Sequence, residues 1–162
     1  MESVILRYAP SYWNKKYTNI SNVIPINSGP EYQKIASDVY QATHFRAFES
    51  IFRIQNIYEL GQMLVREQLM ITLADSNKFY RVRRFTKVKK HFLQIALAFN
   101  LDHRRCGLPI LEFKKHLRGI RPDDVILAVI VVTSTPEADV IIPESSLEYF
   151  IDYIINVSWK KY

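Results

Sequence analysis

The four histidines and the single cysteine are the side chains best suited to act as a base or a nucleophile near neutral pH. Of the four histidines, His91 and His116 stand among lysines, where an exposed and neutral imidazole is expected. The single cysteine, Cys106, follows Asp102 and His103 closely, and a nearby histidine is the group that can activate a thiol. The sequence supplies no base geometry for this pair, so a half-buried and inert thiol is the expected state.

The acidic residues are also too sparse for the usual metal or hydrolytic sites. Asp123 and Asp124 are adjacent, and Glu144 and Glu148 are four residues apart, which does not make a metal site or a catalytic pair of carboxylates. With only 4 glycines, the chain has no glycine-rich phosphate loop. One cysteine excludes an intramolecular disulfide and a multi-cysteine zinc site, which favours an intracellular location, nuclear or cytoplasmic. We therefore expect no metal.

One segment carries all the excess positive charge of the chain. Residues 78–121 hold 13 Lys or Arg against 2 acids, whereas the remainder holds 9 against 14. Such a segment can attract nucleic acid or an acidic partner, with Phe79, Tyr80 and Phe85 available to stack on bases; it can equally be a solvated face. The candidate binding residues are Lys78, Arg81, Arg83, Arg84, Lys87, Lys89, Lys90, Arg104 and Arg105.

The patterning predicts a single α+β domain over residues 1–162, of 19.1 kDa. The longest apolar run, Val125 to Val132, is about half of what a membrane span requires, so no membrane contact is expected. Strands are predicted at residues 23–26, 48–56, 79–85, 125–133, 140–142 and 149–157, and helices at residues 29–44, 57–68 and 87–100. The late strands and early helices imply a mixed sheet with helices packed on it.

Two local patterns predict where the first long helix begins and which side chains of one strand point inward. Ser28 and Glu31 have the spacing of a capping box at the start of the first long helix. In residues 79–85, aromatic or aliphatic residues alternate with basic ones, which predicts that Tyr80 and Val82 face inward while Arg81 and Arg83 face solvent.

Four short motifs, in order along the chain, resemble the catalytic domain of poly(ADP-ribose) polymerases (PARPs), the diphtheria-toxin-like class of ADP-ribosyltransferases. They are most similar to the zinc-finger antiviral protein branch. The motifs are Tyr8-Ala9-Pro10-Ser11-Tyr12-Trp13, Pro30-Glu31-Tyr32, Arg53-Ile54-Gln55-Asn56 and Asn100-Leu101-Asp102-His103-Arg104-Arg105-Cys106-Gly107. The resemblance implies a split mixed, mainly antiparallel β-sheet with packed helices and a cleft that holds NAD.

The residues that hold NAD in this family are replaced here. The family's Phe-His-Gly-Thr strand falls on Phe85-Thr86-Lys87-Val88, so Thr86 replaces the ribose-binding histidine, Lys87 the glycine and Val88 the threonine. The stacking tyrosine aligns with Glu112, and the last family position falls on Glu148 or Phe150. The loop after the central strand is cut to Ser134–Glu137.

These changes predict a catalytically inactive PARP-like domain that has lost NAD binding and has no cofactor. We expect it to act as a protein interaction or scaffold module, with nucleic-acid contact through the basic segment as a second possibility. One alternative is a divergent mono-ADP-ribosyltransferase that uses NAD, with Glu148 and His91 or His116 as substitute catalytic residues. Another is an RNA- or DNA-binding module. The partner and the oligomeric state do not follow from the sequence.

Overall fold

The chain folds around one seven-stranded sheet. The computed structural model describes residues 2–16, 21–75, 77–107 and 110–160. The strand order is β1-β2-β7-β5-β3-β4-β6. Every pairing between the described strands is antiparallel, so the parallel pairing of the expected mixed sheet does not occur among them. The α+β class and the mainly antiparallel sheet are confirmed.

The strands lie close to their predicted positions. They are β1 (Ser21–Pro25), β2 (Phe48–Asn56), β3 (Tyr80–Lys89), β4 (Phe113–Lys114), β5 (Asp124–Thr133), β6 (Val140–Ile141) and β7 (Tyr149–Val157). The limits of β2 and β7 are those predicted. Pro25 ends β1 at one edge of the sheet, where a residue without an N–H group costs no ladder bond.

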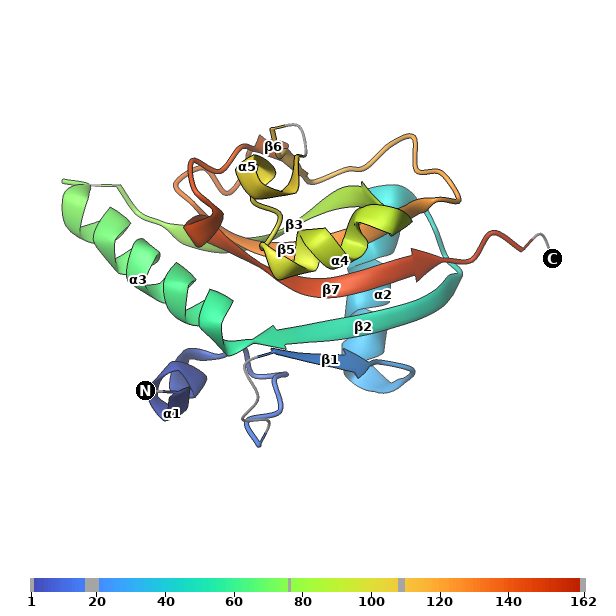
Figure 1. The fold of residues 1–162 in the computed structure, drawn as a ribbon, viewed down its shortest axis with the longest axis horizontal. Helices are drawn as coiled ribbons and strands as arrows, with labels where there is room; N and C mark the ends of the chain where they lie inside the picture. The colour runs from blue at the N-terminus through green and yellow to red at the C-terminus, as the bar shows by residue number, and fades with distance from the viewer. Residues whose placement is uncertain (1, 17–20, 76, 108–109, 161–162) are drawn as a thin grey trace.

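The helices lie on both faces of the sheet. They are α1 (Glu2–Ile5), α2 (Gly29–Thr43), α3 (Ile57–Leu73), α4 (Leu93–Ala98) and α5 (His103–Cys106), with short 3-10 turns at Leu6–Tyr8, Lys90–Phe92 and Ser146–Glu148. In Figure 1, α4 crosses the face of the sheet turned to the viewer and α2 runs behind it. Within the described ranges, no helix is both long and apolar enough to cross a membrane.

The predicted capping box at the start of α2 is wrong. The Ser28 side chain makes no capping hydrogen bond. Glu31 reaches across to Arg53 on β2 and Tyr153 on β7 instead of back to its own helix. A guanidinium and a phenol on the covered face of the sheet bind this carboxylate in place of an exposed backbone amide.

The predicted helix over residues 87–100 is wrong in its first part. β3 continues to Lys89 and pairs with β5 throughout, and the helical structure begins only at Lys90. Val88 alternates with two lysines, so on a strand its side chain enters the core opposite Val125 while the lysines stay outside. Burial of Val88 therefore decides between strand and helix in this short segment.

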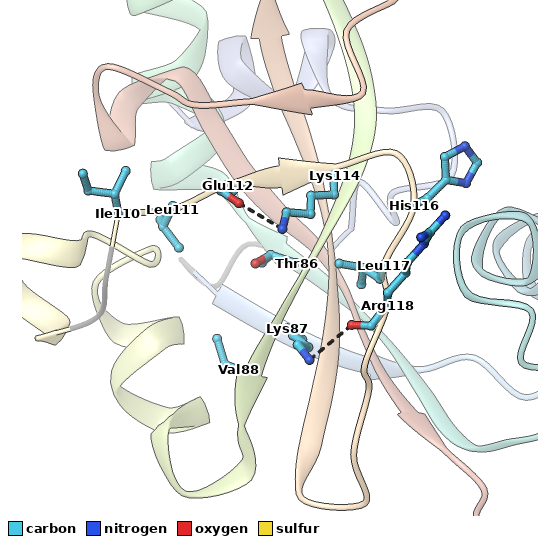
Figure 2. Close-up of a pocket in the computed structure, with 10 residues that line it drawn as sticks. All are labelled: Thr86, Lys87, Val88, Ile110, Leu111, Glu112, Lys114, His116, Leu117 and Arg118. Carbon is cyan, nitrogen blue, oxygen red and sulfur yellow. Dashed lines mark hydrogen bonds and ion pairs between the residues drawn. The ribbon is translucent and has the colours of Figure 1, made fainter.

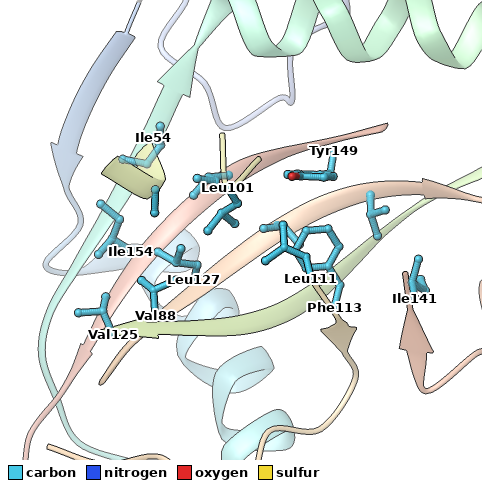
Figure 3. Close-up of a cluster of buried hydrophobic side chains, with 14 residues drawn as sticks. Ile54, Val88, Leu101, Leu111, Phe113, Val125, Leu127, Ile141, Tyr149 and Ile154 are labelled. Carbon is cyan, nitrogen blue, oxygen red and sulfur yellow. The ribbon is translucent and has the colours of Figure 1, made fainter. Parts of the chain in front are cut away.

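Apolar side chains fill both sides of the sheet. On the α4 side, Leu101, Leu127, Phe113 and Ile154 belong to one buried cluster (Figure 3). On the α2 side, the helix residues Ile35 and Val39 belong to a second cluster. This cluster also includes the alternate residues of β5, whose side chains point to this face of the sheet. A third cluster joins α3 to the N-terminal arm through Trp13. The sheet is thus buried on both faces along its central strands, as predicted for β5.

Candidate functional site

A groove lies along β3 at the position where the resemblance puts the NAD-binding strand. Its first cavity, of about 330 Å³, is lined by Thr86, Lys87 and Val88 on β3 and by residues 110–112, 114 and 116–118 (Figure 2). Its second cavity, of about 450 Å³, shares Lys87 and Val88 and continues to Lys89, Phe92, Gly119, Arg121 and Asp124. We call these two cavities together the β3 groove.

Lys87 is the residue that crosses this groove. Its Nζ donates to the main-chain carbonyl of Gly119 on the opposite side and lies 3.4 Å from the carbonyl of Arg118 (Figure 2). The carboxylate of Asp124 is 3.5 Å from the same nitrogen. The ammonium therefore has oxygen partners on three residues, and the Lys87 side chain lines both cavities.

The other positions that the resemblance marks as degenerate lie at different depths. Glu112 is exposed and forms an ion pair with Lys114 at 2.9 Å. Its neighbour Phe113 is buried edge-on against Tyr149, with ring centroids 4.6 Å apart, and does not line the groove. Phe150 is buried under α3 and packs edge-on against Trp13. Phe113 and Phe150 therefore serve the core, whereas the exposed Phe92 lines the second cavity.

The substitute catalytic residues are not assembled into a site. Glu148 is buried and accepts hydrogen bonds from Arg66 and from the backbone of Glu144, and no hydrogen bond joins it to a histidine in the described residues. His91 and His116 are exposed. Burial, together with Asp102, raises the pKa of the Cys106 thiol, which lowers its thiolate fraction. Nor do the described residues include a cluster of three or more metal-ligating side chains.

Three of the predicted binding arginines have partners within the domain. Arg81 pairs with Glu67 on α3. Arg83 donates to Asp38 on α2 at 2.8 Å and to Asp152 on β7 at 2.7 Å. Arg84 is buried and donates to the carbonyls of Pro136 and Ala138, which fixes the short loop after β5 against β3. The predicted outward position of Arg83 is wrong because α2 covers that side of the sheet.

Asp152 is the centre of this internal network. The β5–β7 register shifts between Ala128 and Val129, and the extra residue on β7 is Asp152, which turns it toward the α2 side beside Tyr153. Burial raises the pKa of its carboxyl to about 6, while Arg83 and Tyr12 donate to it and favour the ionised form. The bulge thus places an acid where Arg83 can neutralise it.

A second internal network lies next to the first. Arg53 donates to Glu31 at 2.7 Å and to Gln55 at 3.0 Å, and the Tyr153 hydroxyl donates to Glu31 at 2.7 Å. The Gln55 amide also exchanges hydrogen bonds with the backbone of Asn14 in the N-terminal arm. The Arg-Ile-Gln-Asn motif therefore fastens the arm and α2 to β2.

The remaining predicted binding residues come from several segments of the chain. Lys78, Lys90, Arg104 and Arg105 are exposed on separate segments, and Tyr80 is also exposed, contrary to its predicted inward position. Lys89 pairs with Asp123 and Asp124, whose hydrogen bonds raise the pKa of its ammonium. The sequence reasoning missed the contribution of residues 114–121 to the groove, because that segment approaches β3 only through the fold.

Neither the protein-family models nor the curated proteins compared with the chain match it.

Proposed function

We propose that this chain is a catalytically inactive PARP-like domain that acts as a protein interaction module. The four motifs support this proposal because they follow one another in the order that the resemblance implies, and two of them fall at element boundaries. Pro30-Glu31-Tyr32 opens α2, Arg53–Asn56 ends β2 and leads into α3, and the last motif contains α5. The Tyr12–Trp13 arm packs on the sheet. The ADP-ribosyltransferase-like fold is part of this proposal.

The observation that carries the proposal is the position of Lys87. The resemblance requires a glycine there, so that the backbone can approach nicotinamide. The lysine side chain instead spans the groove, and its ammonium is held by the Gly119 carbonyl and Asp124. NAD binding would have to break these contacts and place nicotinamide against a cation. Glu112 stands where the family has its stacking tyrosine, so this position offers no aromatic ring to offset that cost.

Calorimetry with NAD and a transfer assay with labelled NAD test the loss of catalysis. We expect no measurable heat of binding at millimolar NAD and no label on the chain or on added proteins. An active ADP-ribosyltransferase in the same assay serves as the positive control. Micromolar NAD affinity, or label transfer that depends on Glu148, would establish the divergent transferase instead.

A protein partner is favoured over nucleic acid by the way the cations are engaged. Arg81, Arg83 and Arg84 have internal partners, so the stretch that was most basic in the sequence offers few free charges to phosphates. A nucleic-acid module would show affinity for RNA or DNA that falls steeply with salt. We expect only weak binding, unaffected by Arg84→Met. A steep salt dependence that is lost when Lys90, Arg104 and Arg105 are changed to Glu would favour the nucleic-acid module.

A further inference from the structure

β3 loses its outer neighbour halfway along its length. β4 pairs with it at Phe85 and Lys114. The following chain then turns away, because the Lys115 amide donates to the Asp139 carbonyl and the Leu117 amide donates to the Ala42 carbonyl at the end of α2. On the inner side, β5 continues to pair with β3 as far as Lys89. The outer edge of β3 from residue 86 to residue 89 therefore faces the β3 groove.

The register shows which main-chain groups point into this opening. In an antiparallel ladder, the N–H and C=O of one residue point to the same side, and successive residues alternate. The Lys90 amide donates to the carbonyl of Asp123, its partner on the β5 side. The even-numbered residues of β3 therefore bond to β5. The N–H and C=O groups of Lys87 and the N–H of Lys89 point to the open side, while the Lys89 carbonyl begins the 3-10 turn at Lys90–Phe92. An edge with unpaired main-chain groups is a template for another strand.

The side chains around the opening favour an acidic chain. The groove is lined by more cations than acids: Lys87, Lys89, Lys114, Arg118 and Arg121 against Glu112 and Asp124. Apolar side chains, Val88, Leu111 and Leu117, lie between them. An extended segment in which acidic and apolar residues alternate matches both sets, since alternate side chains of a strand point to opposite faces.

We propose that the β3 groove binds an acidic, extended segment of a partner protein, which adds to the sheet as a strand beside Lys87 and Lys89. This deepens the proposed function by naming the surface and the chemistry of the partner. Main-chain hydrogen bonds supply the affinity in this mode, and the side-chain pockets supply the specificity. The Lys87 ammonium exchanges the Gly119 carbonyl for a carboxylate of the bound segment.

The first test uses fluorescence anisotropy and a labelled heptapeptide, acetyl-Glu-Val-Glu-Val-Glu-Val-Glu-amide, with the wild-type chain. We expect saturable binding with a Kd of about 100 µM or tighter at low salt, weakening as salt rises. Two further peptides carry backbone N-methyl groups, one at the Glu residues and one at the Val residues. Only the set that faces β3 should weaken binding, by about tenfold or more, because it removes main-chain donors without changing charge.

Equal binding of the two N-methylated peptides would overturn strand addition, since only the net charge would then be recognised. No saturable binding of the parent peptide would overturn it too. Tighter binding of a thymidine heptanucleotide, competing with the peptide, would overturn the assignment in favour of nucleic acid. A peptide with Lys in place of Glu is the charge control and should not bind.

Protein variants locate the site. Lys89→Pro removes one N–H that points into the groove and spares the bonds to β5, so it should weaken peptide binding by about tenfold. Lys115→Ala, outside the groove and with its amide bonded to Asp139, is the matched control and should bind as the wild type does. Equal affinity of a folded Lys89→Pro chain would overturn the location. If Lys89→Pro fails to fold, the two N-methylated peptides decide the question on the wild-type chain.

The outcomes separate this inference from the proposed function. NAD turnover by the chain would refute the proposed inactive module, whether or not the peptide binds. If the chain binds neither the peptide nor NAD, only the assignment of the β3 groove as the docking surface is refuted.

Discussion

Both halves of β3 carry basic residues, but the charges have different surroundings in the two halves. In the first half, Arg83 forms ion pairs with acids on α2 and β7. Arg84 donates to main-chain carbonyls of the loop after β5. In the second half, Lys87 and Lys89 lie at an open edge, where their partners are main-chain carbonyls, the exposed Asp123 and the buried Asp124. A run of basic residues in a sequence is therefore not evidence of one basic surface. Each charge must be traced to its own partner.

Arg83→Met removes an internal cation from the first half of β3 and should have the largest effect on the free energy of unfolding. It leaves the fully buried Asp152 without its cationic partner, and removal of one partner of a buried ion pair costs about 3–5 kcal/mol. Urea denaturation of the variant should show that loss in the free energy of unfolding. Lys90→Ala, at an exposed lysine, is the control, with a change of about 0.5 kcal/mol or less. A loss below about 1 kcal/mol for Arg83→Met would contradict the internal role of this charge.

Glu31→Ala should have the next largest effect. It removes the acceptor shared by the buried Arg53 guanidinium and the Tyr153 hydroxyl, and a buried donor without an acceptor costs about 1–3 kcal/mol. Thermal unfolding should show a lower Tm. If Glu31 instead acted as the helix cap predicted from the sequence, Ser28→Ala would destabilise the chain as well. The structure predicts that Ser28→Ala has no comparable effect.

Glu59→Gln tests a buried carboxyl group that forms no ion pair within the part of the chain that the structure describes. Burial raises the pKa of Glu59 to about 8, so between about pH 4.5 and pH 8 the folded chain keeps a proton that the unfolded chain releases. Stability therefore falls as pH rises through this window, by about 2–3 kcal/mol between pH 5 and pH 7. The Gln variant lacks this term, so its stability relative to the wild type should increase with pH. Parallel pH profiles of the two chains would show that Glu59 is ionised in the folded state.

Lys87→Met removes a cation from the second half of β3 and should have the smallest effect on stability. The Lys87 side chain is about one-third exposed (34%), and its buried partner Asp124 keeps the Lys89 ammonium and the Arg121 amide when Lys87 is changed, so the change in unfolding free energy should be below about 1 kcal/mol. The matched comparison with Arg83→Met on the same strand separates an architectural cation from a surface one. Comparable losses for the two variants would remove the distinction between the halves of β3.

The sequence predicted the elements better than it predicted their partners. β2, β5 and β7 were found because aliphatic and aromatic residues repeat over nine or ten positions. The end of β3 was missed because Lys87-Val88-Lys89 fits the start of a helix as well as a strand, and only packing of Val88 distinguishes them. The partners of Arg83 and Glu31 lie on distant elements, so no local pattern could identify them.

The candidate site was also predicted only in part from the sequence. The resemblance located Thr86, Lys87 and Val88, and a cavity does lie beside them. The opposite wall, residues 116–121, was not predicted, because it is held by hydrogen bonds to α2 and to the lysine itself. A lone acid in the apolar run Tyr149–Val157 was the one sequence signal of the Asp152 network.

The position of β7 determines when the sheet can be completed during synthesis. β7 is the last of the seven strands to be made, yet it lies between β2 and β5 and joins them. Until residues 149–157 have left the ribosome, β2 and β5 each present an unpaired edge. The nascent chain therefore holds two half-sheets that are open to wrong pairing, and one late segment closes both.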